Sequence, residues 1–447
     1  MSDVKDLIER ARKAMEAIQD YSQAEVDAMV ENVAKRVYQK AGELAAFAIE
    51  ETGMGRLDSG TEKVQNIAKN VWEDIKAEKS VGVIHYDKET GITELAHPAG
   101  VIGSVTPVTQ PTITPLGNGM MALKGRNALV FSPHPSAIKS TAKTIEVMRD
   151  ALAEVGAPKD LLVYYESPSN QATQDLMANT DLIVATGGPG LVHAAYSSGP
   201  PAYGVGAGNS QGILDDDFDV DKAAELSVAA RAFDNGLPCT SQQILFYPRH
   251  KEADLVAALE KYQAYVITDS ATVDQLRENL IDETGKFKAD LIGKSPHFVG
   301  QVAGVDIPEE AEIVVAKISK NDQEEPLTKE KLFPLMTMAA YDDFEEAVDL
   351  AKRNLVIQGG AGHSSVVFTN SRQREEYVGL HLPISRLMVN QVVNAMGGAT
   401  NGLNTSVSLG CGTWGNNVIS ENLTYRHLLN VSRISDPIDL GEIDHGW

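Results

Sequence analysis

Apolar residues near the start of the chain recur every three or four positions, which is the period of an amphipathic helix. The stretches of about 3–19 and about 61–76 both follow this period. Ser22 and Glu25 form a capping box, so another helix is predicted to begin there. The apolar stripe of that helix consists of Val26, Met29, Val30, Val33 and Val37.

The period then changes to two short extended runs, 81–86 and 92–96, on either side of the polar segment 87–91. This pattern predicts a β-hairpin with a longer loop over about 81–97. A hairpin that interrupts an α/β pattern leaves its edges exposed, and we expect it to pair with another subunit. A hairpin exposed to solvent is the alternative.

From residue 101 onward, short apolar runs at 101–105, 128–132, 161–165 and 182–185 alternate with helical segments. This alternation predicts an α/β fold with a parallel sheet covered on both faces. Ligands bind such sheets at the carboxyl ends of the strands, so the turns after these runs should line a nucleotide site. No GxGxxG segment opens the first helix, and Gly187, Gly188 and Gly190 are equally consistent with a tight turn.

A second alternating region extends to about residue 400, with helices near 223–232 and 252–262 and a strand near 264–268. Between the two regions, residues 203–209 are too rich in glycine for the interior of a strand. Such a segment indicates that the backbone approaches something closely. A chain of 447 residues with two such regions is expected to form two or three domains.

The formal charge of the chain is −23 at pH 7. Because this charge repels nucleic acid and anionic membranes, we expect neither as a partner. An anionic substrate or cofactor must therefore be bound by local positive groups and by helix N-termini.

The chain has two cysteines, which form neither a disulfide framework nor a CxxC metal site. We therefore expect a reduced, cytoplasmic protein without a bound metal. The N-terminal segment lacks the apolar core of a signal peptide, and no stretch is long enough to span a bilayer. A short N-terminal helix can also address a protein to an enzyme shell, although the first helix of the fold is the favoured interpretation.

The segment 233–243 places Cys239 in a turn just before an apolar run. Pro238 fixes the backbone directly before the cysteine. A thiol at the entrance of a strand, where backbone N–H groups can face a ligand, is a candidate nucleophile. For one cysteine taken alone, a small buried apolar residue is the more frequent alternative.

Four separated segments follow one another in the order Pro98–Gly103, Asn127–Pro133, the Cys239 turn and Glu330–Pro334. In this order they resemble the signature segments of the aldehyde dehydrogenase superfamily, over essentially the whole chain. The resemblance implies a Rossmann-like cofactor domain, an α/β catalytic domain and a small β oligomerisation element. Residues 1–211 are then expected to bind the cofactor and to carry the hairpin, 212–402 to form the catalytic domain with Cys239, and 403–447 to return to the oligomerisation element.

Ser132–Pro135, Gly362–Ser365, Leu382–Arg386 and Leu409–Gly415 resemble, more narrowly, the CoA-acylating branch of this superfamily. The resemblance implies a reversible conversion of an aldehyde, CoA and NAD or NADP into an acyl-CoA by a homodimer or homotetramer. No acidic residue follows the second strand of the cofactor domain to repel a 2′-phosphate. The sequence is therefore compatible with NADP as well as with NAD.

By this resemblance Cys239 is the nucleophile, the Cys239 N–H and Gln110 stabilise the oxyanion, and Glu330 holds the nicotinamide ribose. The other residues expected in the cofactor site are Thr106, Pro107, Ser132, His134, Pro135, Gly187, Gly188, Gly206 and Phe333. Gln110 replaces the usual Asn, and Pro238 replaces a more usual apolar residue, so the oxyanion site departs from the family pattern. Without the resemblance, Glu330 would be interpreted as a solvated glutamate in a charged run.

Hydrolytic relatives have a glutamate base in the segment that matches Tyr203–Asn209, where this chain has no carboxylate. Without that base water is a poor acyl acceptor, which leaves the thioester to the thiol of CoA. His363 is a candidate base for that thiol, with a structural histidine as the equal alternative. Arg386 is a candidate for binding the carboxylate or sulfonate of a small anionic aldehyde such as succinate semialdehyde or sulfoacetaldehyde, and Cys411 is expected to pack.

Other functions stay open at this point. An acylating acetaldehyde dehydrogenase is one alternative, a hydrolytic aldehyde dehydrogenase a second, and a nucleotide-binding relative without turnover a third. The missing glutamate argues against the hydrolytic enzyme, and Cys239 together with Glu330 argues against the loss of turnover.

Overall fold

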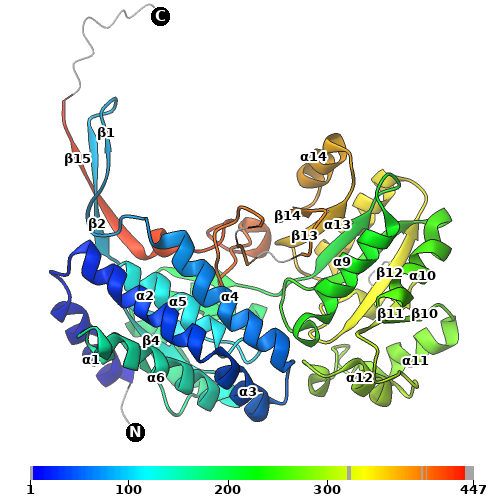
Figure 1. Ribbon diagram of the computed structural model, residues 1–447, viewed down its shortest axis with the longest axis horizontal. Helices are drawn as coiled ribbons and strands as arrows, with labels where there is room; N and C mark the ends of the chain where they lie inside the picture. Colours follow the sequence, from blue (N-terminus) through cyan, green and yellow to red (C-terminus); the bar gives the residue numbers. More distant parts are fainter. Residues whose placement is uncertain (1–3, 320–323, 394–395, 399, 438–447) are drawn as a thin grey trace, which may run out of the picture.

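The computed structural model describes residues 4–319, 324–393, 396–398 and 400–437, which form two α/β lobes and a β arm (Figure 1). The first lobe contains a five-stranded parallel sheet in the order β5-β4-β3-β6-β7. Its strands are β3 (Val101–Val105), β4 (Ala128–Ser132), β5 (Leu162–Tyr164), β6 (Leu182–Thr186) and β7 (Ala202–Val205). The parallel sheet predicted from the apolar runs is confirmed.

Helices cover both faces of this sheet, as the alternating pattern predicts. They are α1 (Val4–Ala17), α2 (Gln23–Gln39), α3 (Ala41–Thr52), α4 (Leu57–Ile75), α5 (Ile113–Lys124), α6 (Ile138–Glu154), α7 (Asn170–Asn179) and α8 (Pro189–Tyr196). The predicted capping box is present, since Ser22 and Glu25 cap each other at the start of α2.

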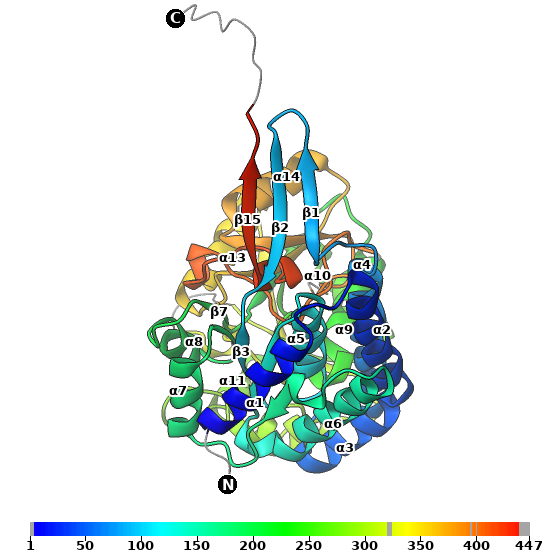
Figure 2. The same ribbon diagram turned by 90° about the vertical axis from the view of Figure 1, so that its left-hand side faces the viewer.

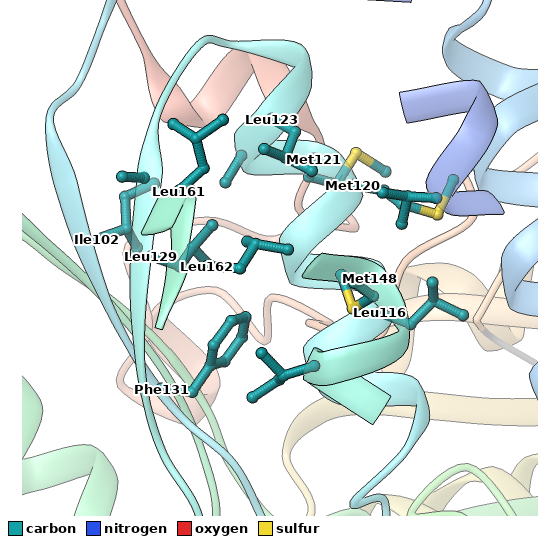
Figure 3. Packing of buried hydrophobic residues seen from close by; sticks show 14 of the residues in the cluster. Ile102, Leu116, Met120, Met121, Leu123, Leu129, Phe131, Met148, Leu161 and Leu162 are labelled. Carbon is teal, nitrogen blue, oxygen red and sulfur yellow. The ribbon is translucent and has the colours of Figure 1, made fainter. Parts of the chain in front are cut away.

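The core of the first lobe lies between this sheet and α5. Figure 3 shows Ile102, Leu129 and Phe131 of the strands packed toward α5, with Met148 of α6 nearby. Every residue of α5 is buried, because the helix contacts the sheet and also α2, α4 and α6. Each large apolar side chain buried in this way contributes about 1.5–3 kcal/mol. The packing fixes the carboxyl ends of β3 and β4, where the candidate site begins.

The second lobe contains a seven-stranded parallel sheet in the order β10-β11-β12-β9-β8-β13-β14. Its strands are β8 (Ser210–Leu214), β9 (Gln242–Pro248), β10 (Ala264–Ile267), β11 (Ile313–Lys317), β12 (Leu335–Tyr341), β13 (Gly362–Phe368) and β14 (Ile384–Val389). Its helices are α9 (Val220–Ala232), α10 (Glu252–Lys261), α11 (Ser270–Leu280), α12 (Pro296–Ala303), α13 (Phe344–Ile357) and α14 (Arg372–His381). Because β8 already belongs to this sheet, the boundary expected after residue 211 falls inside a strand. Within the described ranges, no helix is long and apolar enough to cross a membrane.

The arm is an antiparallel sheet of β1 (Gly82–Asp87), β2 (Ile92–Pro98) and β15 (Leu429–Ser435), with β2 in the centre. The predicted hairpin is therefore confirmed, and the C-terminal part of the chain adds its third strand. Figure 2 shows the arm projecting away from both lobes. Val83, Tyr86 and Ile434 on the arm are each about half exposed, at 50%, 52% and 51%.

One expectation about the segment 203–209 is wrong. Tyr203, Gly204 and Val205 form most of β7, although the segment looks too rich in glycine for a strand. β7 is an edge strand that pairs only with β6. Its glycine is required by packing, because a Cβ on Gly204 would lie 2.8 Å from Val192 Cγ1.

Candidate active site

Cys239 lies in the turn that connects α9 to β9. Asp234, Asn235 and Gly236 have φ values of 50°, 52° and 70°, so three successive residues are left-handed. This conformation costs roughly 1–2 kcal/mol for most residues, and Asp and Asn are among the few that adopt it as single residues. Contacts from outside the turn must therefore hold it in place.

A cavity of about 700 Å³ is lined by Cys239 and by turns of both lobes. Most of the residues expected in the active site line it. They are Thr106, Pro107, Gln110, Ser132, His134, Pro135, Gly187, Gly188, Gly206, Cys239 and Glu330. Phe333, His363 and Arg386 do not line it.

The part of this cavity formed by the first lobe fits a nucleotide cofactor. The turns after β3, β4 and β6 line it, as expected for ligands at the carboxyl ends of parallel strands. Gly188 precedes α8 and provides no side-chain cap. Pro189 has no N–H group and the Leu191 N–H donates to the Gly188 carbonyl at 3.0 Å, so the Gly190 N–H and the helix dipole are what this terminus can offer a pyrophosphate. Among the described lining residues Glu330 is the sole carboxylate. The turn after β4, which contains His134, therefore brings no carboxylate into the lining that would repel a 2′-phosphate.

Cys239 and Glu330 both line this cavity and are partly exposed, and their surroundings shift the pKa of each. Burial raises the pKa of the Cys239 thiol to about 12, and the Glu330 carboxylate contributes to this rise. Burial also raises the pKa of Glu330 to about 7, against the opposing effect of a hydrogen bond from the Gly208 N–H to its Oε1 at 2.8 Å. In the free enzyme at neutral pH the thiol is therefore protonated.

Gln110 brings a side-chain amide into the same cavity as the thiol. Its Oε1 is buried and has no hydrogen-bond partner in the described part of the chain. The Gln110 side chain, although one methylene longer than the usual Asn, therefore reaches the cavity, where its amide N–H groups can serve an oxyanion. That role stays a prediction.

His363 in β13 lies behind the backbone of the Cys239 turn rather than in the cavity. A Cβ on Gly208 would approach the Cys239 carbonyl oxygen to 2.0 Å and His363 Cε1 to 3.3 Å, which shows how closely these three residues pack. Neither ring nitrogen of His363 has a partner among the described residues. Burial, with the nearby Arg386 guanidinium, lowers the pKa of His363 to about 3, so the ring is neutral.

Arg386 in β14 is also buried, and it binds β13 and the C-terminal segment. Its guanidinium donates to the Gly410 carbonyl at 2.7 Å, to the His363 carbonyl at 3.3 Å and to Ser364 Oγ at 3.2 Å. Phe333 packs edge-on against Phe287, with ring centroids 5.1 Å apart. Both side chains support the walls of the site.

A second cavity of about 770 Å³ lies on the other side of the Cys239 turn. Pro238, Thr240 and Met396 line both cavities, so the cysteine is at their junction. Ser241 and Thr405 line the second cavity, are 3% and 1% exposed, and have hydroxyl oxygens without a partner in the described ranges. Sequence reasoning missed this cavity, because its walls come from segments far apart in the chain.

Two further residues near the thiol were missed by the sequence analysis. Lys63 of α4 and Asp234 of the turn form a buried ion pair, with side chains 6% and 3% exposed. The available signal was the position of Lys63 on the apolar stripe of α4, beside Val64 and Ile67. A charged residue on such a stripe needs a buried partner.

The sequence matches the aldehyde dehydrogenase family over residues 1–426. The chain belongs to this family. Among the relatives of this aldehyde dehydrogenase, the succinate-semialdehyde dehydrogenase (acetylating) of Clostridium kluyveri is 42% identical, over 96% of this chain and 95% of that protein. The sulfoacetaldehyde dehydrogenase (acylating) of Bilophila wadsworthia is 36% identical, over 98% of this chain and 96% of that protein. The structure of an acetylating aldehyde dehydrogenase from Geobacillus thermoglucosidasius matches with a TM-score of 0.94 at 36% identity, over 99% of this chain and 98% of that one.

These relatives are acylating enzymes, and this aldehyde dehydrogenase is an oxidoreductase of the acylating type. The family resemblance, the α/β fold and the enzyme class expected from the sequence are therefore confirmed. Acylating members of the family use NAD(P) and CoA. The lining fits a nucleotide, since it combines turns at the carboxyl ends of β3, β4 and β6, and it includes the thiol of Cys239.

The pKa of the thiol predicts how Cys239 reacts in the free enzyme. Because the thiol has a pKa of about 12, alkylation by iodoacetamide should accelerate about tenfold per pH unit between pH 7 and 10, without a plateau. Glu330→Gln removes the neighbouring carboxylate and should give faster alkylation at each pH. The rate is measured by loss of free thiol, with Cys239→Ala used to subtract Cys411. A plateau below pH 9 would show that burial does not suppress the thiolate.

Proposed function

We propose that this aldehyde dehydrogenase oxidises a small anionic aldehyde to its acyl-CoA, reversibly, through a thioester on Cys239. One observation carries the proposal: Cys239 lies where a nucleotide-sized cavity and a second, polar cavity meet. A thiol at this junction can reach an aldehyde held on one side and a cofactor held on the other.

In this proposal the Cys239 sulfur attacks the aldehyde carbon, and its proton leaves for solvent or a nearby acceptor. The Cys239 N–H and the Gln110 amide stabilise the oxyanion that forms. The bound nicotinamide supplies the hydride acceptor. Glu330 holds the ribose through its carboxylate, whose Oε1 also accepts the Gly208 N–H at 2.8 Å.

The proposed acyl acceptor is CoA, because the segment after β7 lacks the glutamate base that hydrolytic relatives have there. Residues 206–209, which follow β7, contain no carboxylate, and the Glu330 carboxylate accepts the Gly208 N–H. An isolated general base contributes typically ~10²–10⁴-fold, so its absence leaves hydrolysis slow. His363 can act as the base for CoA only if its ring becomes accessible from the cavity, since its nitrogens lie outside the lining.

The proposed substrate is an anion such as succinate semialdehyde or sulfoacetaldehyde. Two relatives are named for these aldehydes, and the second cavity supplies matching donors. A buried hydroxyl without a partner costs about 1–3 kcal/mol, and a carboxylate or sulfonate that accepts from Ser241 and Thr405 would remove that cost. Lys63 and Lys222 also line this cavity. Glu62 is the one carboxylate among its described lining residues. Arg386 lines neither cavity, so the proposal assigns the anion to the hydroxyl groups.

Both NAD and NADP are kept as cofactors, because no described carboxylate at His134 excludes a 2′-phosphate. The two cysteines are free, which fits the cytoplasm as the proposed location. An acylating acetaldehyde dehydrogenase is the second candidate function, favoured by the likeness to the Geobacillus enzyme.

We further propose that the arm joins subunits into a homodimer or homotetramer, because β1 and β15 are edge strands with half-exposed Tyr86 and Ile434. Tyr86→Asp with Ile434→Asp should lower the mass measured by analytical ultracentrifugation without lowering the melting temperature of the lobes. Leu380→Asp, at an exposed site away from the arm, is the matched control. A monomeric wild-type enzyme would contradict this proposal.

The substrate proposal predicts a preference that two similar compounds measure. Succinate semialdehyde and butanal differ mainly in the terminal carboxylate, so the ratio of their kcat/KM values isolates its recognition. A hydrogen bond to a charged group contributes about 1.5–3 kcal/mol, so Ser241→Ala and Thr405→Val should each lower this ratio roughly 10–100-fold. Thr405→Ser, which keeps the hydroxyl, should preserve it. A wild-type enzyme with equal efficiency on both compounds and on acetaldehyde would favour the acetaldehyde alternative.

A further inference from the structure

The turn before Cys239 is held from the first lobe. Asp234 is its first left-handed residue, and one of its carboxylate oxygens accepts the Arg56 backbone N–H at 3.0 Å. The other oxygen accepts from Lys63 Nζ. Arg56 and Lys63 lie at the beginning of α4 and within it, and Figure 1 shows this helix running toward the second lobe. The ion pair therefore links the two lobes directly at the nucleophile turn.

The surroundings leave little freedom for this contact. Gly55 has φ of 85°, and a Cβ there would lie 2.4 Å from the nearer Asp234 oxygen. Asn235 donates to the Gly293 carbonyl at 2.9 Å, and Gly293 accepts the Gly55 N–H at 2.9 Å. Asp234 and Asn235 thus fit into the segment before α4, and the ion pair is one of the contacts that hold this turn.

Stability alone does not require an ion pair here. A buried pair can often be replaced by uncharged residues of similar size without loss of stability, whereas removing one partner leaves an uncompensated charge. The location of the pair indicates a role in placing the thiol. Asp234 is five residues before Cys239, in a left-handed turn that contacts from outside must hold. Lys63 also lines the second cavity, on the side where the aldehyde is proposed to bind.

We propose that Lys63 and Asp234 are a positioning pair, which holds the Cys239 turn at the junction of the two cavities and so sets the rate of thioester formation. This inference rests on the proposed role of Cys239 as nucleophile. Neither Lys63 nor Asp234 lines the nucleotide cavity, although Leu237–Thr240 of the same turn do. The turns after β3, β4 and β6 form the first-lobe part of the lining, so we expect a bound nucleotide to keep most of its contacts when the pair is changed.

The experiment compares the double variant Lys63→Met/Asp234→Asn with the wild type. Asn keeps an acceptor for the Arg56 N–H and tolerates the left-handed conformation, so the double variant removes both charges together and retains the fold. The matched control is Lys159→Met/Asp150→Asn, which removes an exposed ion pair of 2.6 Å in the first lobe. Three quantities are measured on each full-length enzyme: the rate of the first turnover, the dissociation constant of NAD(P)H, and the melting temperature.

A misplacement of about 1 Å at a reacting group can cost about 10²-fold in rate. We therefore expect the first turnover of the double variant to slow by roughly 10–100-fold at a temperature well below melting. The dissociation constant of the nucleotide should change far less than this rate, and the control should match the wild type. The single variants Lys63→Met and Asp234→Asn should be at least as slow as the double variant, because each leaves one buried charge alone.

A folded double variant that makes its first turnover at the wild-type rate would overturn the proposal and leave the pair a stabilising contact. A parallel loss of nucleotide binding would also overturn it, because the effect would then be a general disturbance of the fold. A wrong assignment of Cys239 as nucleophile would give a different result. Cys239→Ala would then retain turnover, independently of the ion-pair variants.

Discussion

The Cys239 turn depends on contacts from two directions. On one side it receives the Arg56 N–H and the Lys63 ammonium from α4. On the other side, Gln243 at the start of β9 exchanges two hydrogen bonds with the backbone of Lys331, of 2.9 and 3.1 Å. Because Lys331 follows Glu330, Cys239 and Glu330, the proposed nucleophile and the proposed ribose ligand, are fixed relative to each other.

Buried cations maintain this arrangement through backbone carbonyls. Arg231 donates to the Lys331 carbonyl at 2.6 Å and also to the Phe333 carbonyl, and Lys331 Nζ donates to the Leu327 carbonyl at 2.7 Å. Burial lowers the pKa of Arg231 to about 9 and lowers the pKa of Lys331 well below its usual value. Charges buried in this way are costly unless they are well paired, so their presence beside Glu330 reflects the geometry of a site rather than a gain in stability.

Much of the fold was predictable because local patterns determine it. The capping box at Ser22, the hairpin of 81–97 and the four apolar runs of the first sheet all appear where the sequence places them. The edge strand β7 was missed, because an edge position tolerates glycine and because Gly204 meets its neighbours only in three dimensions.

The candidate site was predictable only in part, for a related reason. Residues at the carboxyl ends of strands, such as Thr106 and Gly188, could be placed in the cavity from the strand pattern. Contacts between distant segments could not be placed in this way. Lys63 and Asp234 are 171 residues apart, and Ser241 and Thr405 line the same cavity from segments far apart in the chain. For His363 and Arg386 the opposite holds. The motif resemblance identifies them as candidates, but both are buried and neither lines the cavity.

The proposed reaction requires an acyl group that stays on Cys239 until CoA removes it. Rapid-quench mass spectrometry of the enzyme mixed with succinate semialdehyde and NAD(P)⁺, without CoA, measures this directly. The account predicts one equivalent of acyl group on the peptide that contains Cys239, which decays slowly in water and is discharged roughly 10²–10⁴-fold faster when CoA is added. An enzyme that carries no acyl group on Cys239, or one that loses it equally fast with and without CoA, would contradict the account.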